Sequence, residues 1–307
     1  MTITSFPERI VLHCGLPKTG TTALQHWCTA NREELLRHGV DYPLVEIARE
    51  VAPITNDRTP KHGFLIAALR NRDMSAVQRA MENAAAPTLL LSTEGLTNHF
   101  YSFPEESLAL LREAFGGIPI DLMIVFREKE KWARSLWKEG VIAFPGTTLG
   151  YKKFLSLPAI QALSDWPQLI KDMKSQFGAR DVLEVSLEEK GWKTPLLDYL
   201  GISGFDEVPE TRDQFNVSIS DDLIELVRRL NTQRLDPMLR LMLFSVIQSK
   251  FTTSHLTLQN AYDWGLPDRN QALRLKRALH ATGSLPKSVA EVKGEILRKL
   301  NAQLADN

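Results

Sequence analysis

The segment of the sequence best suited to chemistry lies near the N-terminus and reads Gly-Leu-Pro-Lys-Thr-Gly-Thr-Thr from Gly15 to Thr22. An apolar run, residues 9–14, precedes it, and an amphipathic pattern begins at Thr21, so this order predicts a strand, a loop and a helix. The start of a helix offers unpaired backbone N–H groups and the positive end of the helix dipole. The segment therefore predicts a site where the amides of residues 20–22 hold a phosphate or a similar anion.

The loop differs at one key position from the Walker motif of nucleotide triphosphatases, GxxxxGK[ST]. Gly15 and Gly20 have the spacing of the two motif glycines. Thr21, however, stands where the motif has lysine, and Lys18 lies within the loop instead. The Walker lysine reaches the β and γ phosphates, and the hydroxyl that follows it binds magnesium. Lys18 would approach the anion from the loop side and neutralise charge on a bridging oxygen, which favours a donor with one leaving phosphate.

A second candidate anion site follows another apolar run. Arg127 comes directly after residues 121–126, and a guanidinium group there can bind a phosphate through two parallel hydrogen bonds. Ser135 follows within a helical pattern and can add a hydroxyl donor. Because the carboxyl ends of parallel strands meet at one edge of a sheet, we expect this site to lie beside the first one.

In these segments the sequence resembles the sulfotransferases that use 3'-phosphoadenosine 5'-phosphosulfate. The motif LPKTGTT, residues 16–22, matches the 5'-phosphosulfate loop of that family, and REKEKWARS, residues 127–135, matches its 3'-phosphate motif. A weaker match is LLLSTEGL, residues 89–96, which contains Glu94. The resemblance covers residues 9–200 of the chain.

The resemblance implies a P-loop NTPase-like fold of three layers with a central parallel sheet. The cofactor would be 3'-phosphoadenosine 5'-phosphosulfate, with 3'-phosphoadenosine 5'-phosphate as product and no metal required, because a sulfuryl group in transfer carries less charge than a phosphoryl group. The cofactor-binding residues that the two motifs imply are Pro17, Lys18, Thr19, Gly20, Thr21, Thr22, Arg127 and Ser135. Lys18 would also be catalytic, because its charge stabilises the departing 5'-phosphate. Lys129 stands where the family often has proline, and the adenine site is unassigned.

Two side chains are candidates for the base that takes a proton from the acceptor. Glu94 follows the strand pattern 88–92 and should lie at the same sheet edge as the loop. Alternatively, its charge complements the dipole of a following helix. His62 precedes a helical pattern and carries an imidazole that titrates near neutral pH, although it could equally be a surface-loop histidine. The sequence leaves the choice between Glu94 and His62 open.

Four apolar runs predict the strands that position these residues, namely 9–14, 88–92, 121–126 and 181–185. Helical patterns cover residues 21–38, 74–84, 105–115, 129–141, 221–231, 238–250 and 288–304. The polar segments 52–62 and 144–150 are predicted to be loops that border a pocket. The alternation of strands and helices predicts an α/β fold with a parallel sheet. We expect residues 1–205 to form this core with the cofactor site, and residues 206–307 a helical C-terminal extension packed on it.

Composition and charge exclude several other classes of protein. The chain has 307 residues, 43% of them hydrophobic and 24% charged, as in a folded chain rather than a disordered or fibrous one. Basic and acidic residues balance at 37 each, so no global field favours nucleic acid or an anionic membrane. No membrane span or signal peptide is recognisable and Cys14 and Cys28 form no CxxC pair, so we expect a cytoplasmic protein. The histidines form no HExxH motif, so we expect no metal site.

The sequence therefore predicts a sulfotransferase that moves a sulfuryl group to a hydroxyl or amine of a small-molecule or carbohydrate acceptor by in-line displacement. Two alternatives are a P-loop small-molecule kinase and a non-catalytic adenine-nucleotide-binding protein. The kinase would need the lysine that Thr21 replaces, and the binding protein would need no base.

Overall fold

The computed structural model describes residues 6–43, 61–143, 146–188, 193–202, 221–233, 235, 269–283 and 287–305. The chain divides into two compact units. The first comprises Met1–Ala133 and Ser156–Glu210, and the second comprises Arg134–Leu155 and Thr211–Asn307. The central sheet belongs entirely to the first unit.

The first unit is built on a parallel sheet of five strands in the order β2-β3-β1-β4-β5. The strands are β1 (Arg9–His13), β2 (Val40–Asp41), β3 (Thr88–Ser92), β4 (Ile120–Phe126) and β5 (Asp181–Ser186). The four predicted strands are therefore confirmed to within one residue at each end. β3 and β4 are consecutive strands in the sequence, but they lie on opposite sides of β1 in the sheet. The carboxyl end of β1 is therefore the topological switch point of the sheet.

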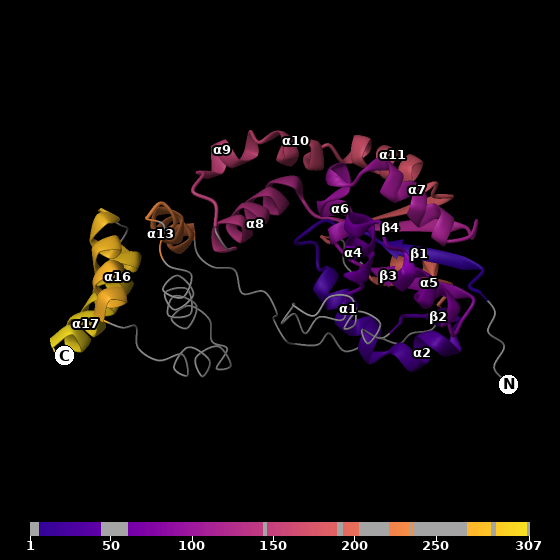
Figure 1. The fold of residues 1–307 in the computed structure, drawn as a ribbon, viewed down its shortest axis with the longest axis horizontal. Coiled ribbons are helices and arrows are strands. Elements are labelled where there is room, and N and C mark those ends of the chain that lie inside the picture. Colours follow the sequence, from indigo (N-terminus) through magenta and orange to yellow (C-terminus); the bar gives the residue numbers. More distant parts are fainter. Residues whose placement is uncertain are drawn as a thin grey trace. The chain divides into compact units, whose positions relative to one another are not determined.

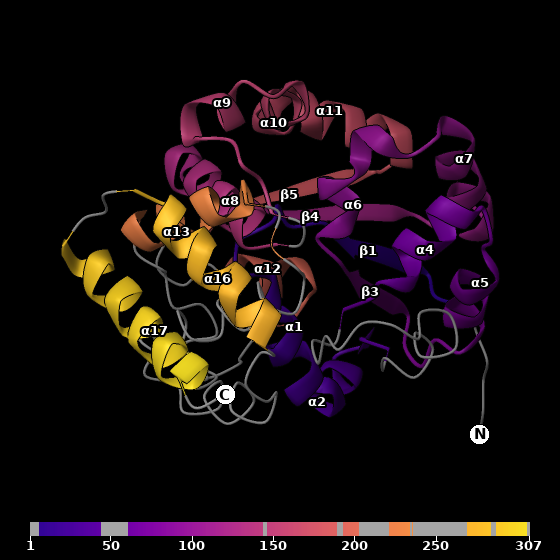
Figure 2. The same cartoon turned by 60° about the vertical axis from the view of Figure 1, so that its left-hand side comes forward.

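Helices cover both faces of the sheet (Figures 1 and 2). On one face, the helices α1 (Thr21–Ala30), α2 (Arg32–Arg37) and α12 (Lys193–Tyr199) share an apolar cluster with the strand residues Val11 and Met123. Alternate strand residues such as Leu12 and Ile124 point to the other face and are fully buried. The helices on that side are α4 (Phe64–Asn71), α5 (Ser75–Glu82), α7 (Glu105–Ala114) and α11 (Trp166–Phe177). This arrangement of helices, sheet and helices is an α/β fold, as the alternating pattern predicts.

Two local features near β1 differ from the sequence prediction. The helix predicted over residues 21–38 is interrupted at Asn31, whose side-chain amide donates to the carbonyl oxygen of Trp27 and caps the end of α1. Gly39, with a φ of 76°, ends α2 as predicted. β2 was not predicted, because two residues are too few to show an alternating pattern.

The second unit contains the distal part of α8 (Lys129–Ile142), α9 (Tyr151–Leu155), α13 (Asp221–Asn231), α16 (Arg269–Ala281) and α17 (Lys287–Ala305). Within this unit, Arg134 and Lys138 of α8 each lie 2.7 Å from the carboxylate of Asp221. These ion pairs tie residues 134–155 to the helices of the C-terminal third. The structure therefore groups 134–155 with the C-terminal helices, whereas the sequence analysis placed this segment in the core.

The remaining predicted elements are found where the structure describes them. The helical patterns 74–84, 105–115 and 129–141 correspond to α5, α7 and α8, and 221–231 and 288–304 correspond to α13 and α17. The predicted helix 238–250 and most of the predicted loop 52–62 lie outside the described residues. Between α8 and β5 the chain also forms α9, α10 (Pro158–Ser164) and α11, which the sequence analysis did not predict.

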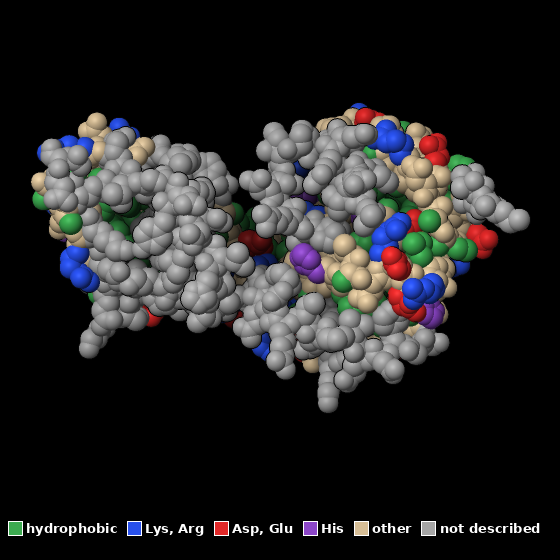
Figure 3. All heavy atoms as spheres, turned by 90° about the horizontal axis from the view of Figure 1, so that it is seen from below, with side chains coloured by type: hydrophobic (Ala, Val, Ile, Leu, Met, Phe, Trp, Pro, Cys, Tyr) green, Lys and Arg blue, Asp and Glu red, His purple; other side chains and the backbone are tan. Residues whose placement is uncertain are grey.

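The surface of the first unit carries both signs of charge. In the described part of the face in Figure 3, Lys and Arg side chains alternate with Asp and Glu side chains, and neither sign gathers into a large patch. This distribution agrees with the net charge of zero. Of the helices that the structure describes, none has both the length and the apolar character to cross a membrane.

Candidate functional site

The segments that carry the predicted site residues meet at the carboxyl edge of the sheet. The backbone N–H of Thr93, after β3, donates to the carbonyl oxygen of His13 at 3.1 Å. On the other side, the N–H of Cys14 donates to the carbonyl oxygen of Met123 in β4 at 2.9 Å. The chain that leaves β1 thus runs between the ends of β3 and β4, where open α/β sheets bind ligands.

The loop after β1 leads into an open helix N-terminus. Gly20 is the N-cap of α1, and its left-handed φ of 78° is a conformation that glycine adopts without strain. Gly20 has no side chain to cap the helix, and the first turn holds no acidic residue. The amides of residues 21–23 therefore lack a side-chain cap from the N-cap residue, which suits the binding of an anion.

The hydroxyls of Thr19 and Thr21 differ in their hydrogen bonding. Thr19 is fully buried and donates from Oγ1 to the carbonyl oxygen of Leu16 at 2.5 Å, which closes the turn of the loop. Thr21 is 6% exposed, and its Oγ1 has no hydrogen-bond partner among the described residues. Of the other predicted loop residues, Pro17 is buried and Thr22 is half-buried. The Thr19 hydroxyl thus shapes the loop, whereas the Thr21 hydroxyl is unsatisfied.

Lys18 is half-buried and has a strained backbone. Its φ of 68° lies in the left-handed region, where a side chain other than glycine costs about 1–2 kcal/mol. Such strain persists only where the surrounding structure imposes it, and it is common at ligand-binding loops. The conformation of Lys18 therefore marks this loop as a candidate binding element.

Arg127 joins the two predicted anion sites. Its Nη1 donates to the carbonyl oxygen of Lys18 at 3.4 Å, so the guanidinium group lies against the backbone of the loop. Its Nε lies 3.8 Å from a carboxylate oxygen of Glu188, just after β5. Both side chains of this ion pair are about one-third exposed, at 32% and 34%, so an incoming anion can displace Glu188 at small cost.

Ser135 lies in α8, within the part of that helix that belongs to the second unit. The helix begins two residues after Arg127, which puts Ser135 roughly two turns from the helix start. The Ser135 side chain is half-buried. Its predicted role beside Arg127 at the 3'-phosphate stays a prediction.

Glu94 follows β3 and lies beside the start of the loop. The Thr97 hydroxyl donates to the carbonyl oxygen of Cys14, which ties the short helix α6 (Gly95–Asn98) to the end of β1. Glu94 is the N-cap of α6, but its side chain forms no capping hydrogen bond. Its carboxylate instead lies 3.6 Å from Lys61 Nζ and is 32% exposed. A carboxylate with this exposure at the sheet edge is able to accept a proton from a bound acceptor.

His62 is buried, and both of its ring nitrogens are engaged. Nδ1 accepts a hydrogen bond from the N–H of Ser92 at 2.7 Å, and Nε2 donates to the carbonyl oxygen of Pro43 at 3.0 Å. Burial lowers the pKa of His62 to about 4, so the ring is neutral at pH 7. His62 thus connects β3 to the backbone at Pro43 and is not a surface-loop histidine. This geometry favours Glu94 over His62 as the base.

The sequence analysis missed a buried polar group beneath the loop, formed by His13, Gln25 and Ser92. Ser92 Oγ lies 2.8 Å from His13 Nδ1 and accepts a hydrogen bond from Gln25 Nε2 at 3.1 Å. All three side chains are fully buried or nearly so. The available signal is a polar residue within an apolar pattern, namely His13 in β1 and Gln25 beside Leu24 in α1.

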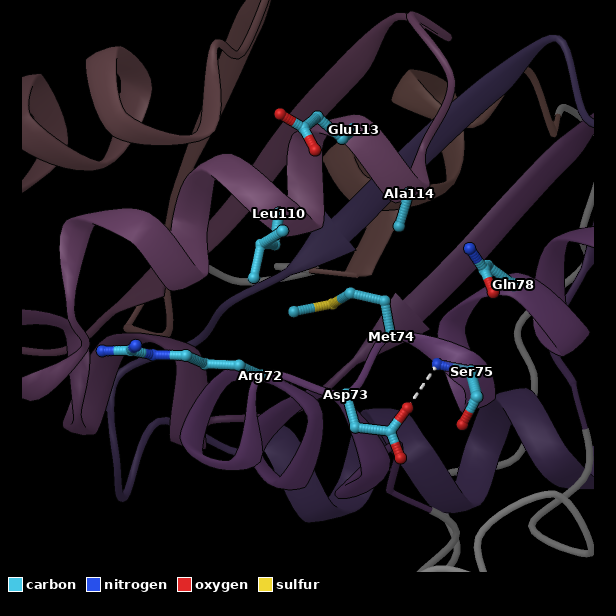
Figure 4. Close-up of a pocket in the computed structure, with 8 residues that line it drawn as sticks. All are labelled: Arg72, Asp73, Met74, Ser75, Gln78, Leu110, Glu113 and Ala114. Carbon is cyan, nitrogen blue, oxygen red and sulfur yellow. Dashed lines mark hydrogen bonds between the residues drawn. The ribbon is translucent and has the colours of Figure 1, made fainter.

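Two grooves of the first unit have no predicted site residue in their lining. One has a volume of about 540 Å³ and is lined by Arg72, Asp73, Met74, Ser75, Gln78, Leu110, Glu113 and Ala114 (Figure 4). The other has a volume of about 500 Å³ and is lined by Phe126, Trp166, Pro167, Ile170 and Glu184. Figure 4 also shows Asp73 accepting a hydrogen bond from the N–H of Ser75, which closes the turn before α5. Within the described ranges, no cluster of three or more His, Cys, Asp or Glu residues is arranged to hold a metal ion.

No protein-family model matches the chain, and no curated protein matches it. The function of the chain is therefore inferred from the fold and from the residues at the carboxyl edge of its sheet.

Proposed function

We propose that the chain is a sulfotransferase that moves a sulfuryl group from 3'-phosphoadenosine 5'-phosphosulfate to a hydroxyl or amine of a small-molecule or carbohydrate acceptor. The observation that carries this proposal is the hydrogen bond from Arg127 to the carbonyl oxygen of Lys18. It joins a strand-end guanidinium to a loop of the phosphate-binding type. A donor with phosphates at both the 3' and the 5' position of its ribose needs two anion sites side by side.

The loop suits the 5'-phosphate end of this donor. Gly20 leaves the first amides of α1 without a side-chain cap, and Lys18 adds a positive charge within the loop. An ideal Cβ on Gly15 would lie only 2.7 Å from Thr21 Oγ1, so the loop packs closely where the motif has its first glycine. The uncapped amides leave backbone hydrogen-bond donors available at the start of α1, as a bound phosphate requires.

Arg127 suits the 3'-phosphate end. Its guanidinium group is one-third exposed and is held by one backbone carbonyl and one carboxylate, that of Glu188. A guanidinium group that exchanges an exposed carboxylate for a phosphate gains two parallel charge-assisted hydrogen bonds. Ser135, from α8, is the proposed second donor to the same phosphate.

In the proposed reaction, the donor supplies the sulfuryl group and a 5'-phosphate that departs with the electron pair of the broken S–O bond. A lone pair of the acceptor oxygen or nitrogen forms the new bond to sulfur from the opposite side. Glu94 takes the proton that the acceptor loses, and Lys61 holds the Glu94 carboxylate in place. Lys18 and the amides of α1 stabilise the charge that grows on the 5'-phosphate.

The experiment that tests this function compares nucleotides by thermal unfolding of the protein. A ligand that binds only the native state raises its unfolding temperature, so 3'-phosphoadenosine 5'-phosphate should stabilise the chain without added metal. Adenosine 5'-phosphate is the matched control for the 3'-phosphate, and ATP with magnesium is the control for a kinase. Stabilisation by ATP with magnesium alone would contradict the proposal and favour the kinase.

Binding by itself does not distinguish an enzyme from a nucleotide-binding protein. The second step is therefore a screen of hydroxyl and amine acceptors for release of 3'-phosphoadenosine 5'-phosphate from the sulfated donor. Product that forms with the wild type and not with Glu94→Gln supports a transferase. Tight nucleotide binding without transfer to any acceptor would favour the non-catalytic alternative.

A further inference from the structure

The groove that is lined by Phe126, Trp166, Pro167, Ile170 and Glu184 has the size and composition of a small-molecule site. Its volume of about 500 Å³ lies within the range of roughly 300–1,000 Å³ that is typical of such sites. Four of the five lining side chains are apolar, and the fifth is a carboxylate. None of these residues has a role in the proposed sulfuryl transfer, so the groove is a candidate for a separate binding site.

Two of the lining side chains are aromatic, and a third ring supports them. The ring centroids of Phe126 and Trp166 lie 5.0 Å apart, with an angle of 38° between the ring planes. The fully buried Trp132 lies at a steep angle of 78° to Trp166, with the two ring centroids 6.2 Å apart. Because Trp166 packs against both other rings, the aromatic surface of the groove is formed before a ligand binds.

Glu184 is the charged residue of the groove. Side chains alternate along β5, and Val185 packs in the apolar cluster with α1 and α12, so Glu184 lies on the opposite face of the strand, with α11. The Glu184 side chain is exposed and forms no ion pair with any residue that the structure describes. The lining contains no Lys, Arg or His. Aromatic rings and an unpaired carboxylate both attract a cation.

The N-terminus of α11 adjoins the groove, but its amides are not available to an anion. Pro167 has no N–H group, and the Gln168 N–H donates to the Asp165 carboxylate at 3.4 Å. The Leu169 N–H donates to the carbonyl oxygen of Asp165 at 2.9 Å. The negative charge of Asp165 also offsets the positive end of the helix dipole. This end of the groove therefore favours a cation over a phosphate.

We propose that this groove binds an organic ammonium ion, a positively charged nitrogen carried on an apolar body. The apolar body packs against Phe126, Trp166 and Ile170. The charged nitrogen lies near the Glu184 carboxylate and the aromatic rings, so that ion pairing and cation–π attraction act on the same group. The proposal goes beyond sulfuryl transfer and does not depend on it.

The first test compares three ligands that share one ring and differ in charge. Benzylamine is a cation at neutral pH, benzyl alcohol is neutral and benzoate is an anion. Benzylamine should bind about five- to tenfold more tightly than benzyl alcohol, and benzoate should bind most weakly. The ¹⁵N NMR signal of the Trp166 indole follows the titrations, and Trp27, on the other face of the sheet, is the reference. Equal affinities for benzylamine and benzyl alcohol, or tighter binding of benzoate, would overturn the proposal.

The second test removes the charge from the groove. Glu184→Gln keeps the shape of the side chain, so the preference for benzylamine should disappear while the affinity for benzyl alcohol stays the same. Glu113→Gln is the matched control, because Glu113 lines the groove of about 540 Å³ in Figure 4, which has no aromatic side chain in its lining. A preference that survives Glu184→Gln, or one that Glu113→Gln abolishes, would overturn the proposal.

The third test concerns the aromatic surface and the relation of the groove to the nucleotide site. Trp166→Leu should weaken benzylamine about fivefold, whereas Trp166→Phe keeps an aromatic face and should bind more tightly than Trp166→Leu. The methyl signals of Ile170 follow binding in both variants, and chemical unfolding shows that each is folded. Equal affinities for the folded variants and the wild type would overturn the proposal. Displacement of benzylamine by 3'-phosphoadenosine 5'-phosphate would do so as well, because the groove would then belong to the nucleotide site.

Discussion

The guanidinium group of Arg127 donates to the main-chain carbonyl oxygen of Lys18 across 109 residues of sequence. Arg127 leaves β4 and Lys18 belongs to the loop after β1, so the contact joins two strand ends at the centre of the sheet. Lys18 and Arg127 are both cationic, and an anion bound between their side chains would offset their mutual repulsion.

Arg127→Ala should weaken the binding of 3'-phosphoadenosine 5'-phosphate by about 2–3 kcal/mol, because a bidentate charge-assisted contact is lost. Ser135→Ala should cost less, about 1 kcal/mol, as for a neutral hydrogen bond. Isothermal titration with adenosine 5'-phosphate is the control, because that nucleotide lacks the 3'-phosphate. An equal loss of affinity for both nucleotides would mean that Arg127 only shapes the loop through Lys18.

Glu188→Gln should strengthen binding of the same nucleotide. In the free protein Glu188 pairs with Arg127 at 3.8 Å, and a bound phosphate must displace it. An exposed pair of this kind contributes about 0.2–1 kcal/mol, so affinity should rise by roughly 1.4- to 5-fold at low salt. The gain should shrink as salt screens the pair. Weaker binding by Glu188→Gln would show that the carboxylate orients Arg127 rather than competing for it.

Lys18→Ala and Lys18→Gly separate the charge of Lys18 from its backbone strain. Both should lower turnover by roughly 100-fold, with a smaller loss of product-nucleotide affinity, because the charge acts mainly on the departing phosphate. Only glycine relieves the left-handed φ of 68°, so Lys18→Gly should be more stable to unfolding than Lys18→Ala by about 1 kcal/mol.

Arg72 provides the matched control for the Lys18 pair. It is the other described non-glycine residue with a positive φ, 56°, and it caps the end of α4. Arg72→Gly should likewise be more stable than Arg72→Ala and should leave turnover unchanged. If Arg72→Gly lowered turnover as much as Lys18→Gly, relief of strain rather than loss of the loop charge would explain both results.

Glu94→Gln should remove turnover and spare nucleotide binding, because glutamine keeps the shape of the side chain and cannot accept the proton. His62→Gln should act mainly on stability, since His62 bonds the backbone of Ser92 and Pro43 through both ring nitrogens. Turnover with a screened acceptor and chemical unfolding are measured for both variants. An active Glu94→Gln enzyme beside a folded, inactive His62→Gln enzyme would transfer the role of base to His62.

Stability should fall as the pH drops from 6.5 toward 4. Burial lowers the pKa of both His13 and His62 to about 4, below the value of 6.5 that holds in the unfolded chain. Between these values the unfolded state binds protons that the native state does not, so acid favours unfolding. With two such groups, the free energy of unfolding should fall by up to about 2.7 kcal/mol for each pH unit in this range.

Guanidinium unfolding of the wild type at pH 7.5, 6.0 and 5.0 measures this slope. His62→Gln removes one of the two groups, so its slope should be smaller by about half of the histidine contribution. Carboxylates that titrate in the same range are common to both proteins and cancel in the comparison. Identical slopes would mean that His62 keeps its ordinary pKa in the native state.

Much of the first unit is determined by local sequence. The strands β1, β3 and β4 are nearly continuous apolar runs because both faces of a central parallel strand are covered by helices. Gly20 and Gly39 mark turns with positive φ, where glycine has no steric penalty. The pattern of apolar residues and the positions of the glycines are properties of short segments, so the strands, the loop and the α/β class could be predicted from local sequence.

Other features depend on side chains that are distant in sequence. Glu188 pairs with Arg127, and Lys61 pairs with Glu94, although the sequence analysis considered neither partner. The segment 134–155 groups with the C-terminal helices through ion pairs to Asp221, 83 or more residues away from the lysine and arginine involved. The pattern of residues within one segment cannot predict its ion-pair partners in other segments, because an ion pair depends only on proximity in space.

For the buried histidines His13 and His62, too, the position could be predicted from the sequence but the surroundings could not. The sequence placed His13 at the end of a strand and His62 before a helix, but the environment of each ring depends on Ser92, which belongs to β3. Only the register of β1 against β3 brings His13 opposite Ser92 and fixes which ring nitrogen is satisfied. The sequence by itself thus determined which chemical groups stand at the ends of the strands. The tertiary structure decided which of them are satisfied, because burial and hydrogen bonding are set by neighbours that other segments bring.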